Sequence, residues 1–505
     1  MAGDVYGMRD EVMARDERYR PSPNGVTWVT TYQLDGAPLL GRDEGEVARV
    51  LDGRRDAQVR DPAVEWIDFV PEDAATPQPE ETLLTDYFPH FHAAELEEHL
   101  PWKVRDAQGD NSTAYVSSFT CFEAVLHIYL YQEMLMGGGV GNIDHRFPKD
   151  KKARIAVIGA GPSGILFASQ HLVKNGYDNF VILEASDRFG GKTRTVHREA
   201  PAEPGRNVPC ELGTCYLSLG YEPMFHLFEQ YDAGQVVALD KDTNQFRSII
   251  DLDVAKTQEE RENGVEYGDW TLRKNGRFKL WEQLEMYVAG IRYLVVHYAT
   301  MGMTMNDCMP VEPPTELNVL ENLQRLLKEA IEQSDEADEK EVPAKDLLGV
   351  LKKEKREEDS TPLKARGLFD LMDDFGQDMD DVKAMVSVDG LKKACRNVLN
   401  TTFGQFLDDN DMDELRSVFT YGYQVQGYGT LDVIPAYYGM VWMTPAVLTG
   451  NIRQLFNADE AASQRGTVNV ASKGWLTLWE KMVERDLKDK IVYNVAISSV
   501  DRVMD

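Results

Sequence analysis

Glycines at a fixed spacing are the residues of this 505-residue chain that point most directly to a chemical role. Gly159, Gly161 and Gly164 follow the pattern G-x-G-x-x-G, with Pro162 and Ser163 between the last two. The first glycine permits a tight turn, the second lets backbone N–H groups approach a pyrophosphate, and the third lets a helix pack closely on a strand. The first turn of that helix offers unpaired N–H groups and a partial positive charge. The spacing therefore predicts a dinucleotide-binding turn.

An acidic residue stands at the distance that such a site requires. Glu184 directly follows a short apolar run, Phe180–Leu183, about twenty residues beyond the glycines. A carboxylate there can accept hydrogen bonds from ribose hydroxyls, which disfavours NADP because NADP carries a phosphate on one of them. A glycine-rich structural turn with no ligand is the alternative interpretation. The strand, the turn and the acid together favour a nucleotide site.

The same stretch predicts the elements that must hold these groups. Residues 154–159 are apolar without polar alternation, which is typical of a strand buried on both faces. An amphipathic helix is expected after the glycines, and Phe180–Leu183 predicts a second strand. A strand, a helix and a second strand in this order indicate the α/β class, with a Rossmann-like domain built on a central parallel sheet.

Residues 187–193, with the sequence DRFGGKT, resemble the D-R-x-G-G-[RK] extension of the flavin-containing amine oxidase superfamily. The resemblance implies FAD as the cofactor. Arg188 would reach a phosphate, the glycine pair would leave room for the ribityl chain, and Lys192 would stand where the flavin ring begins. A basic turn on a surface loop is the alternative. The cofactor contacts implied here are Ala185, Arg188, Gly190, Gly191 and Lys192.

Residues 210–216, with the sequence CELGTCY, resemble an E-x-G-x-x-[YF] segment that lies at the flavin in the superfamily. The resemblance implies that the backbone at Gly213 and Thr214 meets the cofactor and that Tyr216 offers an aromatic wall. An ordinary strand end with a glycine turn is the alternative.

Residues 490–502 resemble the strand pair with which relatives return to the FAD-binding domain. Ile497 falls where the backbone of relatives lies against the adenine. Relatives continue beyond the position of Asp505 through further strands and a glycine-rich segment that meets the flavin. We therefore expect either a fragment of a longer protein or a partner chain that completes the fold.

Residues 420–443 are rich in tyrosine and methionine and resemble a segment of FAD-dependent polyunsaturated fatty-acid isomerases in the same superfamily. Tyr428 and Tyr438 are the residues that we expect to line a pocket. An apolar segment of this kind suits a lipid or aromatic substrate, and it equally suits a buried core. Lys192, Arg194 and Arg247 are candidates for holding a substrate carboxylate.

A chain of this length predicts two or three domains. Residues 122–136 predict a buried helix within an N-terminal extension, and leucines at helical spacing, Leu317 and Leu320 among them, predict a core helix over 316–333. The predicted order is an extension of unknown role (1–150), a first FAD-binding segment (151–230), an α+β substrate domain (231–465) with a charged insertion near 333–366, and a returning FAD-binding segment (466–505).

Composition excludes several classes of function. A net charge of −31 disfavours nucleic acid as a partner, because phosphates would repel it. We expect no membrane span, no secretory signal in residues 1–20, and a cytoplasmic protein whose five cysteines stay reduced. His90 and His92 flank Phe91, but the absence of nearby ligands predicts no metal site.

The resemblance implies an FAD-dependent oxidoreductase in which a substrate carbon transfers hydride to flavin N5, as in amine or amino-acid oxidases. One alternative is a polyunsaturated fatty-acid isomerase, which would return the hydride to another carbon. A second alternative is a non-catalytic FAD-binding or assembly protein. The flavin carries the chemistry in this prediction, so no side-chain nucleophile is required and no catalytic residue is assigned. The substrate would be a small apolar or carboxylate-bearing molecule.

Overall fold

The computed structural model describes residues 88–137, 146–199, 205, 207–218, 220–238, 280–303, 307–323, 325, 388–416, 419, 422–423, 426–445, 447–448 and 468–500. It also describes the backbone of four strands near the N-terminus and before residue 280: β1 (Tyr6–Asp10), β2 (Val29–Gln33), β9 (Val265–Tyr267) and β10 (Trp270–Leu272). β1 pairs antiparallel with β2, and β9 pairs antiparallel with β10. The candidate Arg247 and the predicted charged insertion near 333–366 lie outside the described residues.

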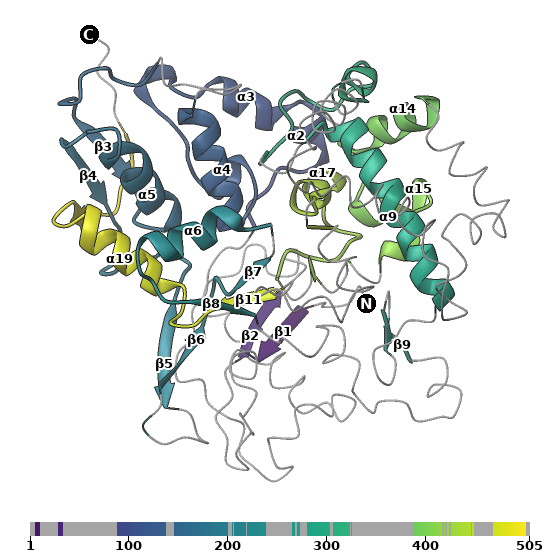
Figure 1. Ribbon diagram of the computed structural model, residues 1–505. Coiled ribbons are helices and arrows are strands. Elements are labelled where there is room, and N and C mark those ends of the chain that lie inside the picture. Colours follow the sequence, from purple (N-terminus) through teal and green to yellow (C-terminus); the bar gives the residue numbers. More distant parts are fainter. Residues whose placement is uncertain are drawn as a thin grey trace, which may run out of the picture.

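A parallel three-stranded sheet lies at the left of Figure 1 and confirms the predicted α/β class. Its strands are β3 (Ile155–Ile158), β4 (Phe180–Leu183) and β12 (Ile491–Val492), in the order β12-β4-β3. Helix α5 (Pro162–Leu166) continues as the wider helix η6 (Phe167–Val173) and connects β3 to β4. The strand from the far end of the sequence therefore completes a sheet that the glycine-rich stretch begins.

The two faces of this sheet differ. Val157 is buried and lies beneath α5, where a Cβ on Gly164 would come within 3.3 Å of its side chain. On the opposite face Ala156 is exposed and Ile158 is 60% exposed. The prediction of a strand buried on both faces is therefore wrong, because the described helices cover only the side that carries Val157.

The helix after the glycines is buried almost all round rather than amphipathic. Every residue from 164 to 172 is buried, because α4 (Val125–Met136) and α19 (Leu476–Asp486) both pack against α5. Gln132 on α4 donates from Nε2 to the backbone oxygen of Ser163 at 2.9 Å. The prediction of an amphipathic helix is wrong, because its outer side contacts a helix that lies earlier in the sequence.

Antiparallel strands extend from the parallel sheet. β5 (Thr195–Glu199) pairs with β6 (Asn207–Glu211), and a second small sheet has the order β7-β11-β8. Its strands are β7 (Tyr216–Ser218), β11 (Val468–Ala471) and β8 (Val236–Ala238), with α6 (Glu222–Gln230) between β7 and β8 in the sequence. The chain thus returns to this region just before α19 (Figure 1).

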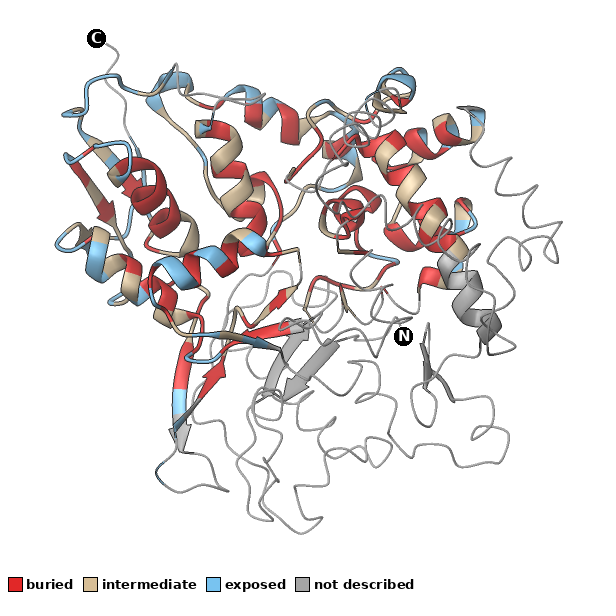
Figure 2. Cartoon of the chain, in the orientation of Figure 1, coloured by how far each residue is buried: buried red, intermediate tan, exposed pale blue. Residues whose placement is uncertain are grey.

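A group of helices forms the right half of Figure 1. It contains α9 (Leu280–Met301), α14 (Val388–Asn397), α15 (Phe403–Asp409), α17 (Ala436–Trp442) and the short η7 (Asp413–Leu415). Figure 2 shows buried residues concentrated where α17 and α15 face α9. The leucine pattern predicted a core helix after residue 316, but Leu317 is 89% exposed and Leu320 is 49% exposed, so those two positions are wrong.

Residues 88–137 connect the two halves, and we call them the bridging segment. They contain α2 (Ala93–Glu97), α3 (Leu100–Asp106), η3 (Asp110–Ser112), η4 (Ser118–Thr120) and α4, which confirms the buried helix predicted over 122–136. α4 contacts α5 on one side, while His127 Nε2 contacts the backbone oxygen of Val441 in α17 at 3.0 Å. Trp102 Nε1 donates to the backbone oxygen of Pro310 at 2.9 Å. The bridging segment is therefore part of the main body.

Candidate functional site

The glycine-rich turn has the geometry that its residue types predicted. Gly159 has φ +93°, a conformation that residues with a Cβ rarely adopt. A Cβ on Gly164 would lie 2.1 Å from the backbone oxygen of Gly159, so only glycine lets α5 approach β3 this closely. Gly161 precedes α5 as its N-cap, and Pro162 and Ser163 form the first turn. Their positions fit a helix N-terminus that faces a phosphate.

The Gly190–Gly191 loop packs directly on this turn. A Cβ on Gly191 would lie 3.0 Å from the Cα of Gly161, and the Gly190 N–H donates to the Ala160 oxygen at 2.8 Å. Among the described residues, and apart from the two chain neighbours, no heavy atom lies within 4 Å of the position of a Cβ on Gly159. Two glycine turns therefore meet backbone to backbone beside an open surface, which is the shape that an extended pyrophosphate requires.

Glu184 lies against the same turn. Its Oε2 accepts the Ala160 N–H at 2.7 Å, and its Oε1 accepts the N–H and the hydroxyl of Ser186 at 2.9 and 2.7 Å. Partial burial raises the pKa of Glu184, but these hydrogen bonds and the charge of Arg188 outweigh burial and leave that pKa below its ordinary value. The carboxylate is therefore ionised near neutral pH and available as an acceptor.

The side chain of Arg188 forms hydrogen bonds with the backbone of the loop to which it belongs. Its guanidinium donates to the backbone oxygen of Gly191 at 2.7 Å and, at 3.3 Å each, to those of Phe189 and Thr193. The predicted contact with a phosphate stays a prediction. The neighbouring Ala185 is exposed.

The segment after β6 packs on the loop that contains Lys192. A Cβ on Gly213 would lie 1.9 Å from the backbone oxygen of Lys192, and the hydroxyls of Thr214 and Thr193 are 3.0 Å apart. Tyr216 is half-buried at the start of β7. The structure thus brings the two segments together, as the resemblance implied, by an approach that requires glycine at 213.

Glu211 has a structural role that the sequence analysis missed. Its side chain is fully buried, and it accepts hydrogen bonds from the Thr195 hydroxyl at 2.6 Å and from the Trp475 N–H at 2.7 Å. This carboxylate joins β5 and β6 to the N-terminus of α19. A hydrogen bond from the N-terminus of a helix favours a carboxylate at that position.

The returning segment contacts the backbone at Glu184, whose side chain lies against the glycine-rich turn. Val495 N–H donates to the backbone oxygen of Glu184 at 2.9 Å, and Asn494 N–H donates to that of Ser186 at 3.0 Å. Ile497, two residues further on, is 40% exposed. The predicted adenine contact therefore lies in a segment that runs alongside Glu184.

The bridging segment contributes a charge that the sequence analysis did not single out. Glu123 Oε1 lies 2.8 Å from Lys192 Nζ, and Glu123 Oε2 accepts from the Ser118 hydroxyl at 2.8 Å. The side chain of Glu123 is only 11% exposed. A single carboxylate inside the apolar run of residues 119–131 was the signal that could have identified it.

Tyr428 and Tyr438 lie in an aromatic cluster that we define as Phe88, Phe122, Tyr428, Tyr438 and Trp442. Ring centroids are 4.8 Å apart for Phe122 and Tyr428 and 5.6 Å apart for Phe88 and Tyr438. Tyr428 is 8% exposed and Tyr438 is 2% exposed. Tyr438 Oη accepts the Phe91 N–H at 3.1 Å, and burial raises its pKa. Both predicted pocket residues therefore pack against the bridging segment.

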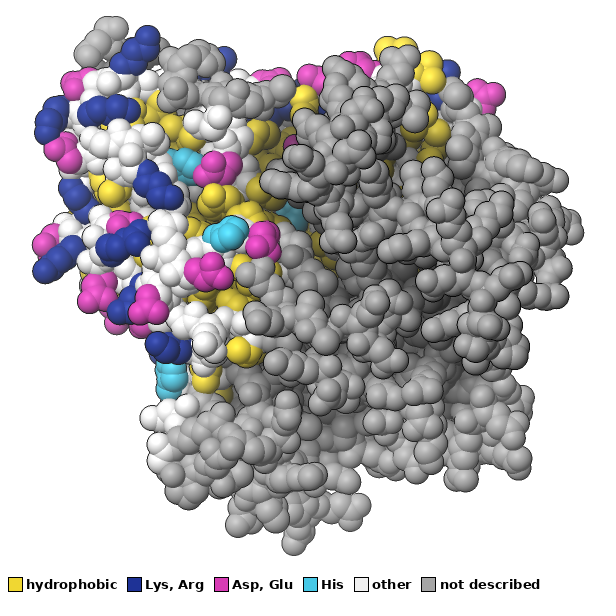
Figure 3. Space-filling view, viewed as in Figure 1, with side chains coloured by type: hydrophobic (Ala, Val, Ile, Leu, Met, Phe, Trp, Pro, Cys, Tyr) yellow, Lys and Arg dark blue, Asp and Glu magenta, His cyan; other side chains and the backbone are white. Residues whose placement is uncertain are grey.

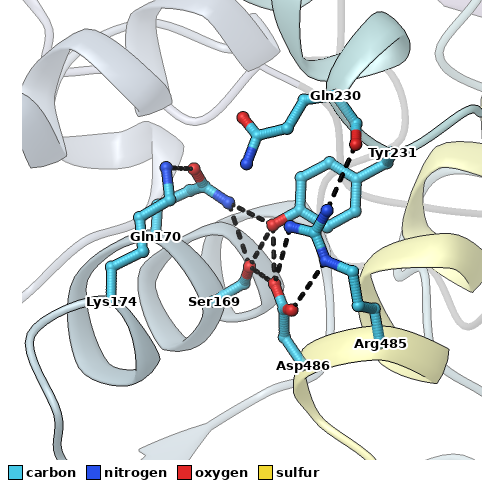
Figure 4. A network of polar contacts seen from close by, with 7 residues as sticks. All are labelled: Ser169, Gln170, Lys174, Gln230, Tyr231, Arg485 and Asp486. Atoms are coloured by element: carbon cyan, nitrogen blue, oxygen red, sulfur yellow. Dashed lines mark hydrogen bonds and ion pairs between the residues drawn. The ribbon is translucent and has the colours of Figure 1, made fainter.

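A polar network fastens α19 to η6 (Figure 4). Asp486 Oδ2 accepts from the hydroxyls of Ser169 and Tyr231 at 2.5 and 2.6 Å, and Gln170 donates to the Tyr231 oxygen at 2.7 Å. The Arg485 guanidinium lies 3.5 Å from the centroid of the Tyr231 ring. Partial burial raises the pKa of Asp486, but the bonds from Arg485, Ser169 and Tyr231 outweigh burial and lower it. The network connects the returning helix α19 to the helix that follows the glycine-rich turn.

Other predicted features are as follows. Within the described ranges no group of three or more His, Cys, Asp or Glu side chains is placed to hold a metal ion, and the His90 and His92 rings are 5.3 Å apart. All five cysteines are described and buried, and none of them forms a disulfide bond. No described helix has the length and apolar character needed to cross a membrane.

On the face drawn in Figure 3, basic and acidic side chains are interspersed over the region of α5, α6 and α19.

Residues 163–339 match the family described as flavin containing amine oxidoreductase. The match confirms the predicted resemblance to that superfamily. It includes the Gly190–Gly191 loop and the segment around Gly213, and it leaves out the bridging segment.

Curated relatives align with this chain over short stretches. Tryptophan 2-monooxygenase of Allorhizobium ampelinum is 37% identical over 103 residues, which are 20% of this chain and 14% of that protein. Protein anon-37Cs of Drosophila melanogaster is 35% identical over 104 residues, which are 20% of this chain and 19% of that protein. The alignments thus cover less than a fifth of each relative.

Two solved structures overlap a larger part of the chain. A CLA-producing fatty acid isomerase from P. acnes has a TM-score of 0.34 and 14% identity over 69% of this chain and 52% of that chain. Putrescine oxidase bound to putrescine has a TM-score of 0.33 and 13% identity over 68% of this chain and 50% of that chain. This chain therefore spans about half the length of either structure.

Proposed function

We propose that this protein is an FAD-dependent oxidoreductase of the amine or amino-acid oxidase type. The observation that carries the proposal is the contact between the two glycine turns, at Gly161 and Gly191, beside the ionised carboxylate of Glu184. The family match over residues 163–339 supports the same cofactor. FAD, when bound, would supply the acceptor for a hydride from a substrate carbon.

The chain's own residues would bind and orient that cofactor. Glu184 would accept the ribose hydroxyls, the first turn of α5 would face the pyrophosphate, and the bare backbone at Gly191 would border the ribityl chain. In this proposal β3, β4, β12 and α5 form a Rossmann-like FAD-binding domain. The helices α9, α14, α15 and α17 form part of a substrate domain, and Tyr428 and Tyr216 border the substrate.

Partner and compartment are part of the proposal. The similarity to tryptophan 2-monooxygenase favours a substrate with an amino or carboxylate group. Five buried cysteines without a disulfide bond favour a reducing compartment such as the cytoplasm. The exposed outer face of β3 favours a further polypeptide that completes the fold.

A single methyl group tests the cofactor site. Gly161 has φ −75°, and a Cβ there would meet only the Gly191 Cα, at an ordinary 3.7 Å. Gly161→Ala should therefore fold normally while it places a methyl on the surface that faces the phosphates. We expect an FAD dissociation constant about tenfold higher or more, measured by flavin fluorescence titration.

Gly220→Ala is the matched control, because its Cβ would also make one ordinary contact, at 3.6 Å from Val447. It should bind FAD like the unaltered protein. Wild-type affinity in the Gly161→Ala variant would contradict the proposed orientation of the nucleotide, and a chain that binds no FAD would overturn the proposal.

The reaction type has its own test. Anaerobic mixing of the FAD-loaded protein with amines and amino acids should bleach the flavin absorbance if the protein is an oxidase. A conjugated-diene band that forms with linoleate, without net bleaching, would instead establish the isomerase alternative, which the apolar cluster around Tyr428 favours. Flavin that stays unchanged with every substrate would support a non-catalytic FAD-binding protein.

A further inference from the structure

One residue of the bridging segment contacts both the Gly190–Gly191 loop, through its side chain, and the aromatic cluster, through its backbone. The carboxylate of Glu123 pairs with Lys192 Nζ at 2.8 Å, and the backbone oxygen of the same residue accepts the Tyr428 hydroxyl at 3.1 Å. Lys192 belongs to the Gly190–Gly191 loop, and Tyr428 belongs to the aromatic cluster. Glu123 thus lies where the proposed cofactor site and the proposed substrate region meet.

The local structure leaves little freedom to either partner. The backbone of Lys192 is held by the close approach of Gly213 to its oxygen, and Arg188 bonds the oxygens of the residues on both sides of it. These contacts therefore fix the backbone at Lys192. Glu123 in turn is fixed between η4 and α4, and Ser118 bonds its second oxygen.

The charges of Glu123 and Lys192 determine how their contact would affect a bound flavin nucleotide. An ammonium group beside a bound flavin nucleotide attracts its negative phosphates and favours an anionic reduced flavin, and a carboxylate 2.8 Å away opposes both effects. Because the side chain of Glu123 is only 11% exposed, water screens that opposition weakly. The Lys152–Asp178 pair offers the contrast, since those side chains are 74% and 60% exposed at the opposite end of β3 and β4.

We propose that Glu123 is a positioning residue that fixes the direction of the Lys192 side chain and partly neutralises its charge, so that the bridging segment sets the affinity and the reduction potential of the bound flavin. The inference rests on the proposed FAD site. It assigns a role to a part of the chain that lies outside the family match and for which the sequence predicted none.

The test compares FAD binding and flavin potential in the full chain and its variants. Glu123→Gln keeps the shape and the hydrogen bond of the side chain but removes its charge. It should bind FAD about fivefold to tenfold more tightly and raise the midpoint potential, measured by equilibration with a reference dye. Ser118→Ala, which only loosens the carboxylate, should shift both quantities in the same direction and by less.

Removing the lysine separates a cofactor role from a purely structural one. Lys192→Met should weaken FAD binding about tenfold and lower the denaturation midpoint, because Glu123 is left charged without its partner. The double variant with Glu123→Gln should recover the midpoint, and its FAD affinity should lie between those of Lys192→Met and Glu123→Gln, because it lacks both the attracting and the opposing charge. Asp178→Asn is the control and should leave affinity and potential unchanged, since its ion pair is exposed and lies away from the loop.

Each outcome decides the inference. Equal affinity and potential in the Glu123→Gln and unaltered proteins, or weaker binding in the variant, would overturn it while the proposed function stands. FAD affinity in the double variant that stays as weak as in Lys192→Met would also overturn it, because the Glu123 carboxylate would then have no effect on the cofactor through its charge. An unaltered protein that binds no FAD would overturn the inference and the proposed function together.

Discussion

The nucleotide turn and the aromatic interior use glycine in opposite ways. At Gly159 no heavy atom of the described residues beyond its chain neighbours lies within 4 Å of a Cβ position, whereas a Cβ on Gly439 in α17 would lie 2.3 Å from the ring of Phe403. The turn keeps backbone uncovered, and the interior uses the same lack of a side chain to admit a ring. The backbone of the turn is therefore accessible from outside, whereas the interior around Gly439 is filled by the protein's own side chains.

The largest expected difference between the two regions is their response to acid. His127 and His297 are fully buried in the interior, and their Nε2 atoms contact the consecutive backbone oxygens of Val441 and Met440 at 3.0 and 2.9 Å. Burial lowers the pKa of each from 6.5 to about 4, and the hydrogen bond to the carbonyl only partly offsets that effect. Protonation would place an unpaired cation inside the aromatic interior.

The two histidines bind protons more readily in the unfolded chain than in the folded protein. Their contribution to the free energy of unfolding is therefore at its maximum above pH 6.5 and is lost as the pH falls towards 4. Each histidine should contribute a loss of about 3 kcal/mol over that window, at 1.36 kcal/mol per pKa unit. Urea unfolding between pH 7 and pH 4 measures it.

Substitution isolates the contribution of the histidines. The His127→Phe, His297→Phe double variant should show a much flatter dependence on pH, whereas His226→Gln, at a side chain 67% exposed, should follow the unaltered protein. A double variant as acid-sensitive as the unaltered protein would show that other groups govern acid unfolding.

The next largest effect is expected inside the turn. Gly164→Ala places a methyl 2.1 Å from the backbone oxygen of Gly159, and a backbone atom cannot move aside without disturbing β3. We expect a loss of about 3 kcal/mol in the free energy of unfolding, at the upper end for overpacking. Gly161→Ala should change it by less than about 0.5 kcal/mol. Equal losses in the two variants would remove the distinction between packing glycine and ligand-facing glycine.

The interior glycine should respond more mildly and should be rescued by its neighbour. Gly439→Ala improves helix propensity by about 1 kcal/mol but drives a methyl into the Phe403 ring, for a net loss of about 1 to 2 kcal/mol. Phe403→Leu also costs stability, yet the double variant should lose less than the sum by about 1 kcal/mol. Strictly additive losses in urea unfolding would mean that Phe403 does not fill the space at Gly439.

The turn was predictable because its determinants are local. A strand, three glycines and Glu184 lie within about thirty residues. Glycine has no side chain, so its presence at these positions already indicates that the backbone must stay uncovered. The pairing of β3 with β4 and the contact of Glu184 with Ala160 follow from that short stretch.

The surroundings of the turn were not predictable, because they depend on distant segments. Gln132 and Ser163 are 31 residues apart and Glu123 and Lys192 are 69 apart, and no periodicity in a single sequence specifies such pairs. The same reason explains the errors. The helix after Gly161 is buried on the side predicted to be polar because α4 covers it, and Leu317 is exposed although helical spacing placed it in the core.

The smallest expected effect concerns the outer face of the parallel sheet. Val157→Ala should cost about 2 kcal/mol because it opens a cavity beneath α5, whereas Ile158→Thr, at a side chain 60% exposed, should cost less than about 0.5 kcal/mol. Thermal unfolding at two protein concentrations tests both the difference and its cause. If Ile158→Thr is as damaging as Val157→Ala and the unfolding temperature of the unaltered protein rises with concentration, a second copy of the chain covers this face in solution. If the loss is large at every concentration, residues of the same chain must cover Ile158, and the contrast between the two faces of the sheet would not hold.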